Sequence, residues 1–268
     1  CLLKMITALP MSAFAWTSEE GVSCTSSFGD YYVGSDGGYY RSKSSYSFIV
    51  YDSDGNTSVR TISAGNAKPK YLMTDSSGTH QVYCVESGID FNTGNSYVSK
   101  NGKNSSYFRK LPTEAQFGVM MALMYGWHEG KSSPVSGTNK DDYAFATQTI
   151  IWEYQQQLRT SPSDLHSANG IDADTYCYSL KGRPSEKCYD WILSQMASHY
   201  TIPSFAARNQ SKADTYTLKY NPDKQDYSLT LTDTNNTLAN LSLSASGIKV
   251  SRSGNQYTFT SDKMITSP

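Results

Sequence analysis

Hydrophobic and polar residues follow two different periods along this chain. Before residue 90 and after residue 215 they alternate in short runs, which is the pattern of half-buried β-strands. Between residues 113 and 200 apolar residues recur every three or four positions, which predicts helices. Strands, helices and strands follow one another in sequence, and this order predicts an α+β fold.

The strand-like runs are bounded by turn residues. Residues 46–51 and 58–62 flank the polar stretch 52–56, whose Asp and Gly residues predict the turn of a β-hairpin. Near the end of the chain, five alternating runs separated by Asn, Asp and Gly predict an antiparallel meander; these runs are residues 215–220, 227–232, 238–243, 248–250 and 257–260.

The helical period predicts three helices in the middle of the chain. They span residues 113–125, a segment that begins between 141 and 147 and ends near 158, and residues 185–200. Thr113 and Gln116 have the spacing of a capping box at the start of the first helix. The apolar stripe of the second helix is expected to pack on that of the first.

The predicted architecture is an antiparallel β-sandwich or barrel with a helical subdomain of about three helices, at about 113–200, followed by a β-rich module. The expected parts are residues 1–15, 16–210 and 211–268. The first part ends in Ala13-Phe14-Ala15 after an apolar run, which predicts a signal-peptide remnant. Two alternatives stay open: the first residues could form a strand of the mature fold, and the last strands could complete the earlier sheet.

Composition favours a polar, strand-rich extracellular protein. The chain of 268 residues contains 21 Tyr, 18% of its residues are charged, and its net charge is −1. It has no basic run or basic helix, which argues against a nucleic-acid or anionic-membrane partner. No apolar segment of the sequence is long enough to cross a membrane.

The five cysteines predict neither a disulfide scaffold nor a metal site. None belongs to a Cys-x-x-Cys pair, so no metal and no cofactor is predicted. Cys177 and Cys188 flank a short loop that contains Gly182 and Pro184, and they are expected to be either a disulfide or two free thiols. Cys84 has no cysteine nearby and is therefore the best candidate for chemistry.

A second unusual residue is Gln148, at the predicted mouth of the second helix, where Thr147 could cap the helix. Cys84 lies in a short β-prone run, so a thiol and a side-chain amide are candidates to meet. If the thiolate attacks the amide carbon and ammonia leaves, the product is an internal thioester. Backbone N–H groups at the helix start could then stabilise the oxyanion when an amine attacks.

These residues carry a family resemblance. Tyr83-Cys84 and the segment Thr147-Gln148-x-x-Ile151-Trp152 resemble the signature of thioester domains from Gram-positive surface adhesins and pilus tips. Tyr125-Gly126-Trp127 is similar to a further motif of that family. The resemblance covers roughly residues 40–200, and it departs from the family pattern at Ile150, where alanine is usual.

The resemblance implies a spontaneous Cys84–Gln148 thioester that forms one amide bond with a lysine-type amine of a host extracellular protein, or with a small amine. Such a domain reacts once and is not an enzyme. The supporting site would comprise Tyr83, Thr147, Trp152, Tyr125, Gly126 and Trp127. The resemblance also implies a secreted protein at the bacterial cell surface, anchored to the cell wall through a region outside this sequence.

Some features of the chemistry stay open in the sequence. His128, Glu86 and His80 are the nearest residues that could act as a base for the incoming amine. One rival hypothesis is a cysteine-dependent hydrolase or transglutaminase-like enzyme that uses Cys84. The other is a non-covalent adhesion module in which Cys84 and Gln148 are core residues.

Overall fold

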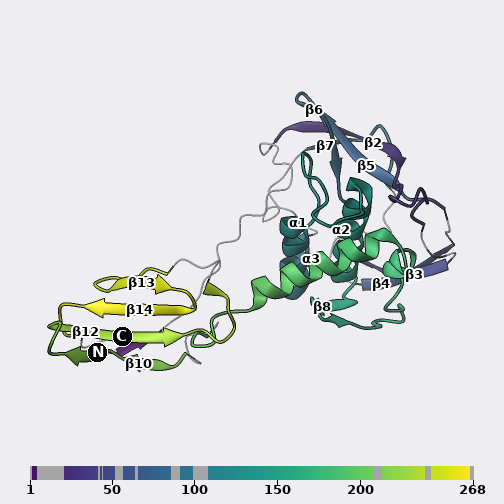
Figure 1. Ribbon diagram of the computed structural model, residues 1–268. Coiled ribbons are helices and arrows are strands. Elements are labelled where there is room, and N and C mark those ends of the chain that lie inside the picture. Colours follow the sequence, from purple (N-terminus) through teal and green to yellow (C-terminus); the bar gives the residue numbers. More distant parts are fainter. Residues whose placement is uncertain are drawn as a thin grey trace. The chain divides into compact units, whose positions relative to one another are not determined.

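The computed structural model describes residues 2–4, 21–41, 43, 45–51, 57–63, 66–85, 91–98, 108–207, 213–238 and 243–265 (Figure 1). Contacts divide the chain into two compact units, of which one comprises residues 12–197 and the other residues 1–11 and 198–268. Helices and antiparallel sheets occur together, so the predicted α+β class is confirmed. The described strands form no closed barrel.

The larger unit contains a four-stranded antiparallel sheet in the order β6-β5-β2-β7. Its strands are β2 (Ser23–Tyr31), β5 (Pro69–Asp75), β6 (Gly78–Val82) and β7 (Ser96–Val98). Two shorter pairs are β3 (Ser45–Tyr51) with β4 (Thr57–Ser63), and β8 (Arg159–Ser161) with β9 (Asp164–Leu165). The pairing of β3 with β4 confirms the strands of the predicted hairpin, whose turn at 52–56 lies outside the described residues.

The predicted helices are α1 (Thr113–Tyr125), α2 (Lys140–Gln155) and α3 (Pro184–Tyr200), accompanied by the short 3-10 helices η2 (Phe108–Lys110) and η3 (Cys177–Leu180). The predicted capping box of α1 is wrong, because Pro112 is the N-cap and makes no side-chain cap. The Gln116 amide instead donates to the Leu111 carbonyl at 2.7 Å.

Helix α2 begins earlier than predicted because Asn139 and Asp142 form a capping box there. The Asp142 N–H donates to Asn139 Oδ1 at 2.8 Å, and the Asn139 N–H donates to Asp142 Oδ2 at 2.8 Å. Thr147 therefore lies inside the helix, and the prediction that it caps the helix is wrong. A polar pair with reciprocal hydrogen bonds satisfies two free N–H groups and so fixes the helix start.

The core of the larger unit is built around α2, in which every residue except Lys140 is buried. Helix α1 packs against it, as expected from their apolar stripes. At Gly118 of α1 a Cβ atom would lie 2.1 Å from the Tyr154 ring, so the two helices approach closely because this position has no side chain.

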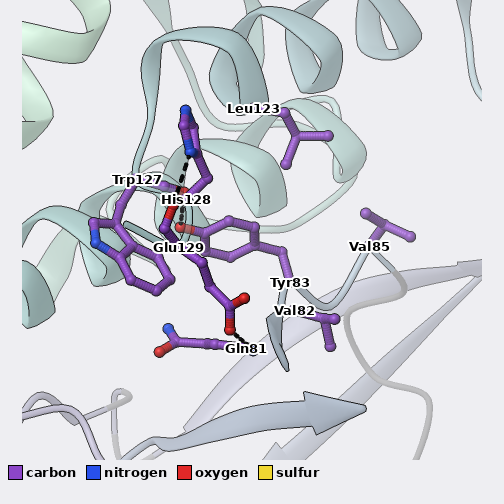
Figure 2. Close-up of a pocket in the computed structure, with 8 residues that line it drawn as sticks. All are labelled: Gln81, Val82, Tyr83, Val85, Leu123, Trp127, His128 and Glu129. Atoms are coloured by element: carbon purple, nitrogen blue, oxygen red, sulfur yellow. Dashed lines mark hydrogen bonds between the residues drawn. The ribbon is translucent and has the colours of Figure 1, made fainter. Parts of the chain in front are cut away.

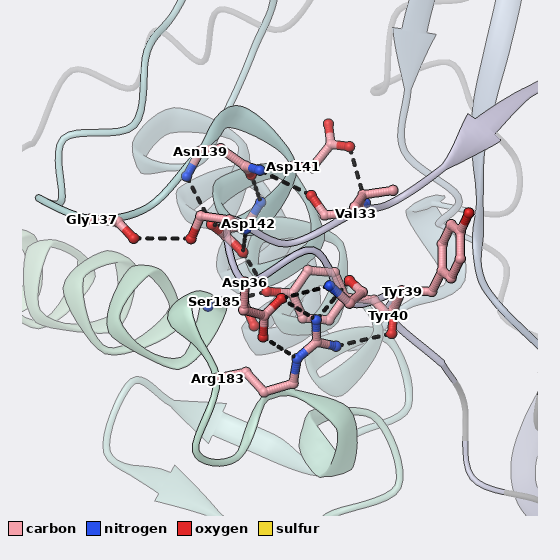
Figure 3. Close-up of polar contacts among 12 residues, drawn as sticks. Val33, Asp36, Tyr39, Tyr40, Gly137, Asn139, Asp141, Asp142, Arg183 and Ser185 are labelled. Carbon is pink, nitrogen blue, oxygen red and sulfur yellow. Dashed lines mark hydrogen bonds and ion pairs between the residues drawn. The ribbon is translucent and has the colours of Figure 1, made fainter.

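The start of α2 is tied to the loop after β2 by two buried aspartates (Figure 3). Asp141 Oδ2 accepts the Val33 N–H at 3.1 Å. Asp142 accepts the Ser35 N–H at 3.1 Å and also the Tyr40 hydroxyl. These bonds fix the position of α2 along its axis relative to the loop. They therefore also fix the axial positions of the side chains that follow in the helix.

Arg183, directly before α3, joins the same loop to the third helix (Figure 3). Its guanidinium lies 4.0 Å from the Tyr40 ring centroid and donates to both carboxylate oxygens of Asp36, at 2.9 and 2.8 Å. These hydrogen bonds lower the pKa of Asp36 to about 2. The loop, α2 and α3 are thus connected by charge-assisted hydrogen bonds.

The smaller unit is mainly a four-stranded antiparallel sheet in the order β11-β12-β14-β13. Its strands are β11 (Lys219–Asn221), β12 (Asp226–Thr232), β13 (Lys249–Ser253) and β14 (Gln256–Ser261), and a separate pair is formed by β1 (Leu2–Lys4) with β10 (Thr215–Thr217). The core residues include Phe205, Leu218 and Phe259.

Two strand predictions for this unit are corrected by the pairing. The order is not a plain meander, because β12 pairs with β14 and leaves β13 at an edge. The predicted strand 215–220 is divided at Leu218, a buried residue. Most of the predicted strand 238–243 lies outside the described residues.

Among the helices that the structure describes, none is long and apolar enough to span a bilayer.

Candidate functional site

The side-chain amide of Gln148 is clamped to the backbone of Cys84. The Cys84 N–H donates to Gln148 Oε1 at 2.8 Å, and Gln148 Nε2 donates to the Cys84 carbonyl at 2.8 Å. Gln148 is fully buried, whereas Cys84 is half-buried and is not part of a disulfide. The structure therefore brings together the two residues that the sequence singled out, although they are 64 positions apart.

Cys84 lies just beyond the end of β6, and Gln148 lies in the middle of α2. This placement corrects one expectation. Backbone N–H groups inside a helix already donate to carbonyls one turn earlier, so they cannot form the oxyanion site that was expected at a helix start. Donors for a developing negative charge must come from elsewhere, and the Cys84 N–H, which already contacts Gln148 Oε1, is one such group.

A second glutamine of the same helical face makes the same kind of clamp. Gln156, at the end of α2, donates through Nε2 to the Ile49 carbonyl at 2.8 Å, and its Oε1 accepts the Ile49 N–H. Gln148, Trp152 and Gln156 are spaced four residues apart, so they lie along one side of α2. Two side-chain amides of this face therefore hold strand β3 and the segment that follows β6.

Trp152, on this face of α2, belongs to a hydrophobic cluster that also contacts Cys84. Its buried members are Ile49, Trp152, Leu158, Ile171 and Tyr176, and Cys84 is one of the partly buried residues packed against it. Trp152 is 5% exposed, and its ring lies 5.4 Å from the Tyr176 ring, centroid to centroid. An apolar wall of this kind limits the access of water to the junction of Cys84 and Gln148.

Lys68 contributes a cation to the same wall. Its Nζ lies 5.7 Å from the centroid of the Trp152 ring. Burial lowers the pKa of Lys68, and the negative charge of a Cys84 thiolate acts in the opposite direction. Lys68 and Cys84 are therefore both associated with the cluster that contains Trp152.

The other side of the Cys84 backbone is held by a short chain of hydrogen bonds. The Tyr83 hydroxyl donates to the Trp127 carbonyl at 2.6 Å, and the Trp127 N–H donates to Thr147 Oγ1 at 2.9 Å. At Gly126 a Cβ atom would lie 2.3 Å from Thr147 Cγ2, so this segment can approach α2 only because residue 126 is glycine. The neighbours of Cys84 and Gln148 are thus joined through Trp127. Burial raises the pKa of Tyr83, which stays protonated.

A pocket of about 200 Å³ opens beside this chain of hydrogen bonds (Figure 2). Its lining residues are Gln81, Val82, Tyr83, Val85, Leu123, Trp127, His128 and Glu129. Tyr83 and Val85 are the residues on either side of Cys84. The pocket has mostly apolar walls, and Glu129 supplies a carboxylate.

The structure separates the residues considered as bases. His128 lines the pocket, where its Nδ1 lies 3.3 Å from the Glu129 carbonyl. His80 Nδ1 lies 2.9 Å from Glu129 Oε2, and the other oxygen of that carboxylate accepts the Gln81 N–H. Glu86 lies outside the described residues. Of the two histidines, His128 is thus the one that lines the pocket beside Cys84.

Two further aromatic residues connect α2 with α1 or with its end. Tyr154 packs against Gly118 on the α1 side of α2. Tyr125 is joined to α2 through its backbone, because its carbonyl accepts the Tyr143 hydroxyl.

Cys177 and Cys188 are free thiols in the structure, which is the second of the two alternatives open in the sequence. Burial raises the pKa of Cys177 to about 12, and the negative charge of Glu153 acts in the same direction. Cys188 lies on α3 with its sulfur 3.5 Å from Ser133 Oγ. The two thiols have different neighbours, and both are kept protonated by burial.

Sequence reasoning did not find Gln156 or Lys68. Gln156 carried a usable signal, because its spacing of four and eight residues from Trp152 and Gln148 places all three on one helical face. Lys68 had no such signal. It precedes Pro69 in a polar run, and its position depends on backbone hydrogen bonds with Tyr32 and Tyr40, which lie far from it in the sequence.

A comparison with protein-family models agrees with the motif. Residues 81–198 match the family model described as the thioester domain. Among solved structures, the chain is similar to the thioester domain of the Staphylococcus aureus TIE protein, with 18% sequence identity and a TM-score of 0.39, over 90% of this chain and 77% of that chain. A search of curated proteins finds no match.

Proposed function

Because residues 81–198 belong to the thioester-domain family, we propose that this chain binds its target covalently through an internal thioester between Cys84 and Gln148. Thioester domains are covalent binding modules of surface adhesins and not classical enzymes. The observation that carries the proposal for these two residues is the clamp, in which both polar atoms of the Gln148 amide bond to the backbone of Cys84.

Thioester formation from an amide is unfavourable in water. The clamp favours the reaction by positioning the two groups and by placing a hydrogen-bond donor on the amide oxygen. The Cys84 sulfur adds to the Gln148 amide carbon, the carbon–nitrogen bond breaks, and ammonia leaves with a proton from the surroundings. Fixing the two groups in one geometry can contribute about 7 to 11 kcal/mol. The Cys84 N–H also lies on the amide oxygen, where negative charge develops during the addition.

The thioester then reacts with an amine. Nitrogen attacks the same carbon, the carbon–sulfur bond breaks, and the product is an amide at Gln148 with a free Cys84 thiol. Nothing in this sequence of steps restores the thioester, so each molecule reacts once. The full burial of Gln148 and the apolar wall around Trp152 disfavour the competing reaction with water.

The pocket beside Cys84 supports a lysine side chain as the amine donor. Its apolar walls suit the aliphatic stem of lysine, and the carboxylate of Glu129 and the ring of Trp127 suit the ammonium group as it approaches. A volume of about 200 Å³ suits one side chain and not a larger ligand. We infer that the target is a lysine-bearing host protein met by a secreted adhesin at the bacterial surface.

Intact mass spectrometry of freshly purified protein tests the proposed function. We expect the mass to be lower than that of the sequence by one ammonia molecule, and incubation with methylamine to add one methylamine. A lysine-rich protein incubated with the chain should give a covalent product that survives denaturation. A fresh protein with the full mass of its sequence, inert to methylamine, would contradict the proposal.

Filling the pocket is expected to separate protein targets from small amines. Leu123→Trp places an indole in the pocket, so a lysine stem loses its apolar contacts. Since burial of each methylene contributes about 0.8 kcal/mol, conjugation to a lysine-bearing protein should slow by on the order of tenfold. Uptake of methylamine, which has no stem, should keep its rate, and this serves as the internal control. Equal slowing of both reactions would argue against the pocket as the site for the lysine stem.

A further inference from the structure

We propose that Lys68 is the proton carrier of the thioester reaction, giving a proton to the departing ammonia and later taking one from the incoming amine. This inference rests on the proposed Cys84–Gln148 thioester. Lys68 precedes the matched family segment, which begins at residue 81.

The backbone of Lys68 is fixed from both sides. Its N–H donates to the Tyr40 carbonyl at 2.8 Å, and its carbonyl accepts the Tyr32 N–H at 2.9 Å. The first of these bonds reaches the loop that also holds the start of α2 through Asp142. Lys68 and Gln148 are therefore positioned by the same loop, and the side chain of Lys68 starts from a defined point.

The side chain of Lys68 extends to the wall of the proposed thioester. Its Nζ lies 5.7 Å from the ring centroid of Trp152, which is one helical turn after Gln148 on the same face of α2. Cys84 packs against the cluster to which Trp152 belongs. One aromatic ring therefore contacts the amine of Lys68 and belongs to the cluster that contacts Cys84.

Burial gives the amine of Lys68 the properties of a proton carrier. Desolvation by this apolar wall lowers its pKa, and a thiolate at Cys84 raises it. The proton is therefore held more tightly while the thiolate exists and less tightly once the sulfur is acylated. A lysine whose pKa moves toward neutrality can act both as an acid and as a base.

The other charged or titratable groups near Lys68 have different roles. The pKa of Tyr32 is raised by burial and by Cys84, so its hydroxyl stays protonated. Lys70 forms an ion pair with Asp141, with Nζ 2.8 Å from Oδ2, and its Nζ lies 5.9 Å from the centroid of the Tyr32 ring. His80 and His128 make their described contacts with Glu129.

The proposed steps balance in atoms and charge. The Cys84 thiolate adds to the Gln148 carbon, the nitrogen takes a proton from the Lys68 ammonium, and ammonia leaves a neutral thioester beside a neutral amine. When a neutral target amine attacks, the carbon–sulfur bond breaks and the thiolate returns. The proton lost by the new amide nitrogen then goes to Lys68, which becomes an ammonium again.

The experiment compares Lys68→Met, which removes both charge and proton, with Lys68→Arg, which keeps a charge but does not release its proton near neutral pH. Lys140→Met, at the one exposed position of α2, is the matched control. For each protein we would measure the thioester fraction in fresh samples by intact mass. We would also measure the rate of methylamine uptake from about pH 6 to about pH 9, because buried amines of lowered pKa titrate in this range.

Both Lys68 variants should take up methylamine more slowly by about a hundredfold, the lower range for acid–base catalysis, while the control keeps the wild-type rate. The wild-type rate should also show a titration step that both variants lack. If Lys68→Met fails to fold, the rate of methylamine uptake by Lys68→Arg alone tests the inference. Wild-type rates in a folded Lys68→Arg would overturn the inference while leaving the thioester intact. A peptide in which Lys68 itself is joined to Gln148 would also overturn it, because Lys68 would then be a nucleophile. Absence of ammonia loss in the wild type would instead refute the proposed function.

Discussion

Cys84→Ala is expected to abolish both the loss of ammonia and the uptake of methylamine while the fold stays intact. Cys84 contributes only its backbone N–H and carbonyl to the clamp, so an alanine keeps both hydrogen bonds to Gln148. The substitution removes the sulfur and a few contacts with the cluster around Trp152. Intact mass before and after methylamine gives the readout, and the thermal melting curve shows that the variant is folded.

Gln156→Ala is the matched control, because it removes a glutamine that clamps a strand in the same way. It leaves the Ile49 N–H and carbonyl without these partners, at a cost of about 1 to 3 kcal/mol, but it should keep the ammonia loss and the methylamine adduct. A folded Gln156→Ala without the adduct, or a Cys84→Ala that still loses ammonia, would show that the reactive bond is elsewhere.

Glu153→Gln is expected to give the largest loss of stability, about 3 to 5 kcal/mol, because it leaves a buried cation without its counter-charge. Glu153 is fully buried in α2, and Arg159 donates to its Oε2 from Nε at 2.9 Å. The Tyr189 hydroxyl lies 2.9 Å from both carboxylate oxygens and accepts from Arg159 Nη2 at 2.6 Å. A neutral amide in this place cannot balance the guanidinium.

The free energy of unfolding of the larger unit is measured by denaturant titration. Glu114→Gln, on the exposed first turn of α1, makes the same chemical change without a buried partner. We expect it to cost less than about 1 kcal/mol, the size of a helix-terminus charge effect. Similar losses in both variants would mean that the buried pair contributes no more than a surface carboxylate.

Periodicity predicted the kinds of elements better than their ends. The three helices and the strands of the hairpin at β3 and β4 are present, because their apolar spacing is imposed by burial. The start of α2 was missed, since the reciprocal bonds of Asn139 and Asp142 decide it and the apolar pattern does not. The bounds of α1 were predicted correctly, but its cap was not, because Pro112 occupies the N-cap in place of Thr113.

The site was predictable only where a motif marked it. Cys84 and Gln148 were paired through short signatures, since no local rule connects residues that are 64 positions apart. The placement of Gln148 at a helix mouth followed from taking Thr147 as a cap, although Thr147 Oγ1 instead accepts from Trp127 and donates to the Tyr143 carbonyl. Lys68 lies near Trp152 while its backbone bonds to Tyr32 and Tyr40, and the apolar pattern of a single strand does not reveal such contacts.

The two glutamine clamps of α2 also bear on how such a bond could arise. Holding a strand against a helix with a carboxamide is a structural task in its own right, and Gln156 performs it opposite Ile49. The same carboxamide contact therefore occurs in two chemical settings. Gln156 faces Ile49, whose side chain cannot attack an amide, whereas Gln148 faces a residue with a thiol, so the proposed bond needs only a sulfur at one of the two contacts.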